Sequence, residues 1–176
     1  TFIKEQDITK FIQLYYNNLD RLSASQFFYF SKVFFDKASK FFDIYYVYDQ
    51  NKELCAGHIY LKDYNKYFVY LTAGSYDKFQ LRPNCLAYNE AIKVAIKNNS
   101  EVFHFGGGSK NLYFYKKTFS KQRIPYFTCK KIFNMSVYNE LIETFIGRHN
   151  LNIEKDFFPK YREFDINYKP YEKMRK

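Results

Sequence analysis

The chain has 176 residues, of which 47% are hydrophobic, and it carries a formal net charge of +10. This length and apolar content exclude an intrinsically disordered chain and predict one packed domain. No apolar run is long enough to span a bilayer, and no segment has the pattern of a signal peptide. We therefore expect a cytoplasmic protein, placed at most at the inner face of the membrane. Because the sequence starts at Thr1 rather than Met, we also expect that an N-terminal portion is missing.

The positive charge has two interpretations. A basic surface favours an anionic partner such as nucleic acid, a nucleotide-linked substrate or a membrane surface. The basic residues are, however, dispersed in short doublets such as Lys116-Lys117, and an AT-rich coding bias toward Lys, Asn, Phe, Tyr and Ile produces the same composition. Charge alone therefore does not select nucleic acid.

Apolar spacing in the first half predicts two helices followed by three strands. The first helix is capped by Asp7 and carries apolar residues at helical spacing as far as Leu19, and the second covers 27–35. Strands are predicted over 41–48, 53–61 and 67–72, with turns at 49–52 and 63–66.

Helices and strands alternate in the second half. A helix begins at Pro83, which the first turn tolerates, and ends near Asn98. It is followed by a strand over 102–105, a helix over 111–119, a strand over 125–132 and a helix over 136–145. The order α-α-β-β-β-α-β-α-β-α predicts an α/β fold with a mixed central sheet flanked by helices. We expect one domain over 1–150 and an irregular tail over 151–176 that packs on the domain or frays from it.

The cysteines and histidines do not form a metal-binding pattern. Cys55, Cys85 and Cys129 are odd in number and lack metal-ligand spacing, which predicts plain buried thiols. His58 lies in an apolar predicted strand, and His104 immediately precedes the glycines described next. A histidine beside a ligand-facing loop can act as a general base, and the alternative is a core histidine with satisfied hydrogen bonds.

Three consecutive glycines, Gly106, Gly107 and Gly108, follow the predicted strand over 102–105. Glycines at the carboxyl end of a strand allow backbone amides to approach a ligand closely, and α/β proteins bind ligands at such ends. The alternative is an ordinary turn. The spacing of a Walker phosphate-binding loop is absent.

Four blocks of sequence together resemble the FemAB-like transferases and their polysaccharide-cluster relatives in the GNAT superfamily. FHFGGGS over 103–109 and LYFYKKTFS over 112–120 resemble the F-x-L/F-G-G-G … S-L-F-x-F-K-x-G-F-[GS] signature of that family. The other blocks are YYNNLDR over 15–21 with Ser25 and Tyr29-Phe30, RPNCL over 82–86 with EAI over 90–92, and PYF over 125–127 with KKIFN over 130–134. They occur in the order of the family and cover the chain from Phe11 to Ile146.

The resemblance implies a GNAT-like fold and an acyltransferase. The enzyme would move an acyl or aminoacyl group onto an amine of a cell-envelope glycan or peptidoglycan precursor, linked to a nucleotide or a lipid. The resemblance also implies aminoacyl-tRNA or acyl-CoA as donor and no tightly bound cofactor. The expected partners include tRNA, a second GNAT-like domain and the membrane surface by peripheral contact. The signature lysine corresponds to Lys116, which would stabilise charge during transfer.

Two residues are therefore predicted to be catalytic, Lys116 and His104, with a solvated helix lysine as the alternative for Lys116. Arg21 would clamp a phosphate or carboxylate, with a surface salt bridge as the alternative. The full set of predicted substrate-binding residues is Arg21, Tyr29, His58, Tyr76, Asn84, Gly106, Gly107, Gly108, Tyr115 and Lys117.

The sequence departs from the family in its signature and in one loop. Tyr115 stands in place of Phe, Thr118 stands in place of Gly, and the Q/R-x-x-G-x-G/A loop of ordinary GNAT enzymes is absent between Ser75 and Asn84. Two other functions stay open: a non-catalytic domain that binds RNA or another polyanion, and a degenerate half of a two-domain GNAT-like protein.

Overall fold

The computed structural model describes residues 1–149 and 158–162. They belong to two compact units, the first made of residues 1–24 and 30–121 and the second of residues 25–29 together with the described part of 122–176. The predicted tail over 151–176 falls almost entirely outside the described residues. A single domain over 1–150 stays a prediction.

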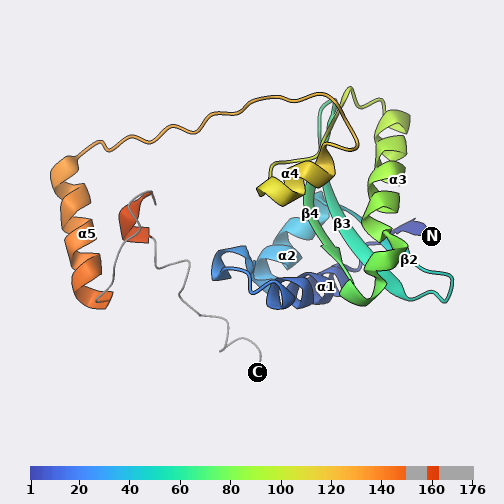
Figure 1. Cartoon of the computed structure of the whole chain (residues 1–176), viewed down its shortest axis with the longest axis horizontal. Helices are drawn as coiled ribbons and strands as arrows, with labels where there is room; N and C mark the ends of the chain where they lie inside the picture. The colour runs from blue at the N-terminus through green and yellow to red at the C-terminus, as the bar shows by residue number, and fades with distance from the viewer. Residues whose placement is uncertain (150–157, 163–176) are drawn as a thin grey trace. The chain divides into compact units, whose positions relative to one another are not determined.

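The first unit is built on a five-stranded sheet in the order β1-β2-β3-β4-β5 (Figure 1). The strands are β1 Phe2–Lys4, β2 Asp43–Tyr48, β3 Leu54–Asp63, β4 Lys66–Gly74 and β5 Val102–His104. β1 to β4 pair antiparallel, and β5 joins β4 in parallel. The mixed α/β class predicted from the sequence is therefore confirmed.

Four α-helices accompany this sheet: α1 Ile8–Arg21, α2 Lys32–Ala38, α3 Pro83–Lys97 and α4 Lys110–Lys116. The Asp7 side chain caps α1 by accepting a hydrogen bond from Thr9 N, as its sequence predicts. α1 and α3 lie on opposite faces of the sheet (Figure 1). Neighbouring residues of β3 show this directly, because Gly57 faces Phe11 of α1 whereas His58 bonds Asn84 of α3.

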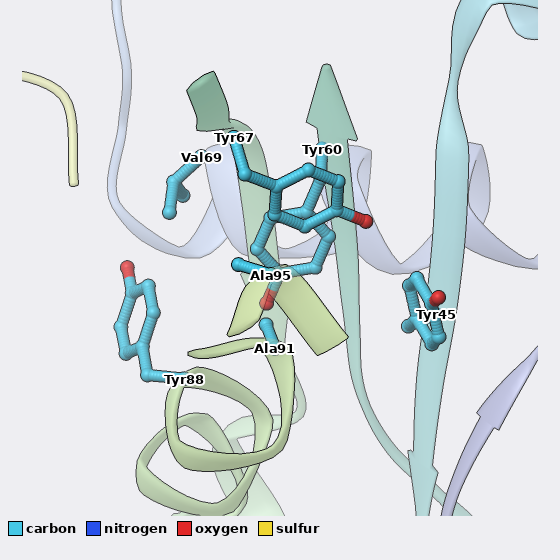
Figure 2. Close-up of a cluster of buried hydrophobic side chains, with 7 residues drawn as sticks. All are labelled: Tyr45, Tyr60, Tyr67, Val69, Tyr88, Ala91 and Ala95. Atoms are coloured by element: carbon cyan, nitrogen blue, oxygen red, sulfur yellow. The ribbon is translucent and has the colours of Figure 1, made fainter. Parts of the chain in front are cut away.

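The core between α3 and the sheet is rich in tyrosine (Figure 2). Tyr60 and Tyr67 stack at a ring-centroid distance of 5.3 Å, and Tyr45 meets Tyr60 edge to face. α3 presents small side chains to this layer, the buried Ala91 and Ala95, so that the helix backbone approaches the rings closely. This packing fixes the second half of α3 against the sheet.

The second unit contains α5, Met135–His149, and a short 3-10 helix, Lys160–Arg162. The Tyr138 ring stacks on Phe158 at 6.0 Å, and its hydroxyl accepts a hydrogen bond from Lys160 N at 3.2 Å. The strand predicted over 125–132 is wrong, since this segment has no regular secondary structure. Its aromatic and apolar residues favour a strand, but no described residue pairs with it as a strand.

Three further predictions need correction. β1 was missed because three residues are too few for a periodic signal. The helix predicted over 27–35 is instead a 3-10 turn, Gln26–Phe28, followed by α2. Of the thiols predicted to be buried, Cys129 is exposed and Cys85 half-buried, and only Cys55 is buried.

No helix in the described part of the chain is long and apolar enough to cross a membrane.

Candidate functional site

A cleft of about 550 Å³ lies in the first unit, where β4 ends and α3 begins. β4 pairs with β5 only as far as Phe68 and His104, and beyond this point it is paired with β3 alone as far as Gly74. Such crevices beyond the carboxyl ends of strands are usual ligand sites in α/β proteins. The lining residues are Asn18, Arg21, Thr72, Ala73, Gly74, Ser75, Tyr76, Phe79, Arg82, Pro83, Asn84, Cys85, Tyr115 and Thr118.

Arg82 begins α3 in an unusual backbone conformation. Its φ of 51° and ψ of 47° lie in the left-handed region, and its carbonyl accepts hydrogen bonds from the Cys85 and Leu86 amides. This conformation costs a residue with a side chain about 1–2 kcal/mol, and the helical regions are further disfavoured before Pro83. The fold therefore holds a strained arginine at the rim of the cleft, where the positive end of the α3 dipole also lies.

The charged residues of the cleft wall are two arginines, and no aspartate or glutamate is among its lining residues. Within the described residues, neither Arg21 nor Arg82 takes part in an ion pair. Arg21 donates to the Asn18 side-chain oxygen at 3.1 Å, and its guanidinium lies 4.8 Å from the Tyr76 ring centroid. The cleft is consequently electropositive and suited to an anionic ligand.

An exposed aromatic pair continues from Arg21 along the rim. Tyr76 and Phe79 stack at 5.5 Å with an interplanar angle of 19°, and their exposed fractions are 59% and 57%. Two large rings that remain more than half exposed next to a cation can stack on a planar or ring-shaped ligand group.

Asn84, at the start of α3, is held by the core beneath it. Its Oδ1 lies 2.8 Å from Nε2 of His58, whose Nδ1 lies 2.9 Å from the Tyr60 hydroxyl. His58 is fully buried, and burial lowers its pKa to about 4, against the smaller raising effect of the Asn84 hydrogen bond. The imidazole is therefore neutral at pH 7. It forms a hydrogen bond with Asn84 and does not itself line the cleft.

Tyr115 brings a hydroxyl from α4 to the same cleft. Its oxygen lies 3.3 Å from the Cys85 sulfur, and the pKa of the phenol is raised, mainly by burial and then by the hydrogen bond to Cys85. Tyr115 therefore keeps its proton well above neutral pH. A neutral hydroxyl of this kind can donate a hydrogen bond to a departing anion.

Lys116 joins α4 to the glycine turn, which is formed by Gly106, Gly107 and Gly108. None of these residues is among the residues that line the cleft. The Lys116 Nζ donates to Gly107 O at 2.7 Å, and burial lowers the pKa of the ammonium group. Gly106 has a φ of 71°, which only glycine adopts without strain, and its amide donates to His104 Nδ1 at 3.0 Å. The local order of this turn comes from these contacts.

Comparison with known proteins identifies structures that share this fold. No protein-family model matches the sequence, and no curated protein matches it. An aminoglycoside acetyltransferase from an uncultured soil metagenomic sample superposes with a TM-score of 0.54 at 7% identity, over 75% of this chain and 99% of that chain. A second aminoglycoside acetyltransferase from such a sample, solved with trehalose, gives 0.52 at 17% identity, over 75% and 95%. A "possible acetyltransferase" from Clostridium difficile gives 0.56 at 8% identity, over 76% and 98%.

The chain has the fold of the GNAT acetyltransferases. The GNAT-like architecture predicted from the sequence is thus confirmed. The identities are too low for these likenesses to show more than the fold, and the FemAB-like specificity is not among what they support.

Within the GNAT fold, four of the predicted site residues meet in the cleft: Arg21, Tyr76, Asn84 and Tyr115. The remaining candidates lie elsewhere. Lys116, His104 and the three glycines form the neighbouring turn, Lys117 is exposed with its Nζ 3.8 Å from the Phe114 ring centroid, His58 is in the core, and Tyr29 belongs to the second unit. The roles predicted for them stay predictions.

Sequence reasoning missed Arg82, Cys85 and Phe79 as cleft residues. Arg82 carried a usable signal, because a basic residue directly before a helix-initiating proline lies at the positive end of the helix. Cys85 and Phe79 had no such signal, since their exposure to the cleft depends on how α3 packs on the sheet.

Proposed function

We propose that this chain is an acyltransferase that moves an acyl group from acyl-CoA onto an amine. The observation that carries the proposal is the cleft of a GNAT fold whose wall, among the described residues, combines two arginines without ion pairs, the hydroxyl of Tyr115 and no carboxylate. This set of groups suits an anionic donor and the release of a thiol.

The donor is supported by charge and by an open strand edge. Coenzyme A carries several phosphate charges, which Arg21, Arg82 and the positive end of α3 attract. The edge of β4 that faces β5 is unpaired after Phe68 among the described residues, so its backbone groups can bond the amides of an extended pantetheine arm. We prefer acyl-CoA to the alternative donor, aminoacyl-tRNA, because the structural neighbours are acetyltransferases.

The chemistry follows from the groups in the cleft. The amine nitrogen attacks the thioester carbonyl carbon, the tetrahedral intermediate collapses, and the C–S bond breaks. Tyr115 donates a hydrogen bond to the departing thiolate, and the proton that the amine loses reaches the thiolate through water. Because no histidine or carboxylate lines the cleft, the amine arrives neutral and the cleft contributes chiefly orientation.

The acceptor is an amine on a sugar or glycan. Tyr76 and Phe79 offer an exposed stacked pair on which a sugar ring can pack, and two neighbours with this fold are named aminoglycoside acetyltransferases. The FemAB-like blocks in the sequence add the finer proposal that the acceptor is a precursor of a cell-envelope glycan or of peptidoglycan.

The first test is the thermal unfolding of the chain with acetyl-CoA, at low and high salt. Binding to the folded state alone stabilises it by about 2.7 kcal/mol at a hundred times Kd, so we expect a saturable rise in Tm that persists at high salt. Arg82→Gly is the matched control, because glycine adopts the left-handed conformation without strain while the guanidinium is lost. This variant should stay folded and show a smaller rise.

Other outcomes favour the alternatives. Stabilisation by heparin and RNA that disappears with salt, with none by acetyl-CoA, would indicate a non-catalytic polyanion-binding domain. No stabilisation by any of these ligands would contradict the acyl-CoA proposal and leave aminoacyl-tRNA as donor or a degenerate half-enzyme.

A further inference from the structure

Asn84 lines the cleft, while the residue that holds it, His58, never reaches the cleft. His58 is fully buried in β3, and it is the one buried polar residue among the described residues. We infer that His58 is a positioning residue, which turns the Asn84 amide so that its NH₂ group donates a hydrogen bond to an oxygen of the bound acyl donor. The inference rests on the proposed function and assigns a role within the same cleft.

The hydrogen bonds of His58 fix the direction of the amide. Asn84 Oδ1 can only accept, so the histidine Nε2 that lies 2.8 Å away carries the proton. In a neutral ring Nδ1 is then an acceptor, and it receives the Tyr60 O–H at 2.9 Å. The second contact of Tyr60, to Ala87 O, is longer at 3.3 Å. This network leaves Asn84 Nδ2 facing away from the core.

The groups around His58 keep it neutral and immobile. Besides Tyr60 and Asn84, the ring meets Tyr88 edge to face at 5.0 Å, and Thr72 is its partner across β3 and β4. No carboxylate or cation contacts it among the described residues. Nothing near His58 favours a charge, and both of its nitrogens are bonded, so the ring is locked in one tautomer.

Gly74 provides a second observation. A Cβ at this position would lie 3.2 Å from Asn84 Nδ2 and 3.6 Å from Oδ1. The end of β4 therefore leaves room for the amide where a side chain would press on it. Asn84 Nδ2 makes no hydrogen bond within the described part of the chain, although this NH₂ group can donate two. A ligand oxygen at this point would accept the hydrogen bond that the Asn84 NH₂ group can still donate.

The ligand group is an oxygen that accepts, either a carbonyl of the acyl-pantetheine arm or a phosphate oxygen of the nucleotide. Two probes distinguish these sources, because S-acetylpantetheine keeps the carbonyls and lacks the nucleotide phosphates. Loss of affinity for both probes on changing Asn84 would indicate a carbonyl, and loss for acetyl-CoA alone would indicate a phosphate.

The variants are chosen to separate donation from charge and from packing. Asn84→Asp keeps the oxygen that accepts from His58 but removes the donor, and Asn84→Leu removes the donor without adding charge. We expect both to weaken acetyl-CoA binding by calorimetry about tenfold, the scale of one lost hydrogen bond. An effect of Asn84→Asp alone would reflect charge repulsion and would overturn the inference, as would wild-type affinity in both.

The positioning role has its own matched pair. His58→Gln places an N–H donor close to where Nε2 lies, whereas His58→Leu removes it. With folding checked by circular dichroism, we expect Gln to retain most of the affinity and Leu to lose as much as the Asn84 variants. Equal affinity in the two His58 variants would contradict positioning through Asn84.

Nitrogen NMR of the imidazole reads the tautomer without any ligand. We expect Nε2–H at pH 7, and a shift of the Asn84 NH₂ signals on addition of acetyl-CoA. The Nδ1–H tautomer would mean a reversed amide and would overturn the inference whatever the activity. If the wild-type chain does not bind acetyl-CoA, the proposed donor fails and the ligand part of this inference fails with it, while the tautomer still decides the positioning part.

Discussion

At the scale of single residues, burial determines the protonation of the groups next to the cleft. His58 is neutral because the core accepts no charge there, and Tyr88 beside it has a pKa raised by burial to about 12. Tyr115 keeps its proton for the same reason, with Cys85 contributing. His58, Tyr88 and Tyr115 therefore each keep one protonation state near neutral pH.

The lowered pKa of His58 predicts a loss of stability in acid. The folded pKa of about 4 lies below the ordinary value of 6.5, so the unfolded chain takes up a proton that the folded chain refuses. Stability is complete above pH 6.5 and falls as the pH drops toward 4. The expected loss from this one group between pH 7 and pH 4 is about 3 kcal/mol.

Urea unfolding across this pH range measures the effect. Carboxylates with lowered pKa values, such as Glu5 and Glu90, also lose stabilising charge in acid, so the wild-type slope contains their contribution. His58→Gln keeps them and removes only the imidazole. Its stability should fall less than that of the wild type, and parallel curves for the two proteins would refute the assignment.

At the scale of elements, the strongest local coupling near the cleft is between the glycine turn and α4. Lys116 donates from α4 to Gly107 O, and Gly108 allows Leu112 of α4 to pack where a Cβ would lie only 2.6 Å from Leu112 Cδ2. The turn and the helix therefore hold each other in place. α4 in turn carries Tyr115 into the cleft.

Lys116→Ala tests whether this lysine does more than tie the turn. Losing its hydrogen bond should cost about 1 kcal/mol of stability, and the charge-stabilising role predicts that acetyl transfer to an amino sugar is abolished. Release of the CoA thiol measures transfer. Lys117→Ala is the control, since Lys117 is the neighbouring lysine and is exposed, with its Nζ 3.8 Å from the Phe114 ring centroid. Equal rates in wild type and Lys116→Ala would reduce Lys116 to a structural tie.

Elements with strong local signals could be predicted from the sequence, and those that depend on pairing could not. α1 has a capping aspartate and a clear apolar face, and α3 has proline in its first turn, so both were predicted closely. The segment over 125–132 carries apolar residues and resembles a strand of the family, yet a strand also needs a neighbour, which no local pattern specifies. β1 forms because β2 offers an edge to three otherwise unremarkable residues.

The site divides in the same way. Arg21, Asn84 and Tyr115 were identified from their residue types and the blocks around them, but their convergence depends on how α1, α3 and α4 meet at the end of β4. The role of His58 could not be read from the sequence, because a buried histidine that orients a neighbour and one that touches a ligand look alike there. The left-handed backbone of Arg82 likewise follows from the junction of two elements.

At the scale of the whole molecule, the described residues divide so that one unit holds all of the cleft. Every lining residue lies between Asn18 and Thr118, and each buried core residue in the described part of the chain lies at or before Ala95. The described part of the second unit exposes Ile124, Tyr126 and Phe127 and contributes no lining residue. Removal of the residues after Lys121 should therefore leave the cleft intact.

A chain ending at Lys121 tests this division. It keeps the five strands, α1 to α4 and the cleft, so we expect cooperative unfolding, a stability within about 1 kcal/mol of the full chain, and the same rise in Tm with acetyl-CoA. Because Ile124, Tyr126 and Phe127 are removed, solubility should improve. Loss of cooperative unfolding would instead mean that residues after Lys121 stabilise the first unit. In that case hydrogen exchange on the full chain should find protected amides over 125–132, which is the behaviour of a paired strand. Exchange without protection there, together with a stable truncated chain, would establish that the first unit folds without the residues after Lys121.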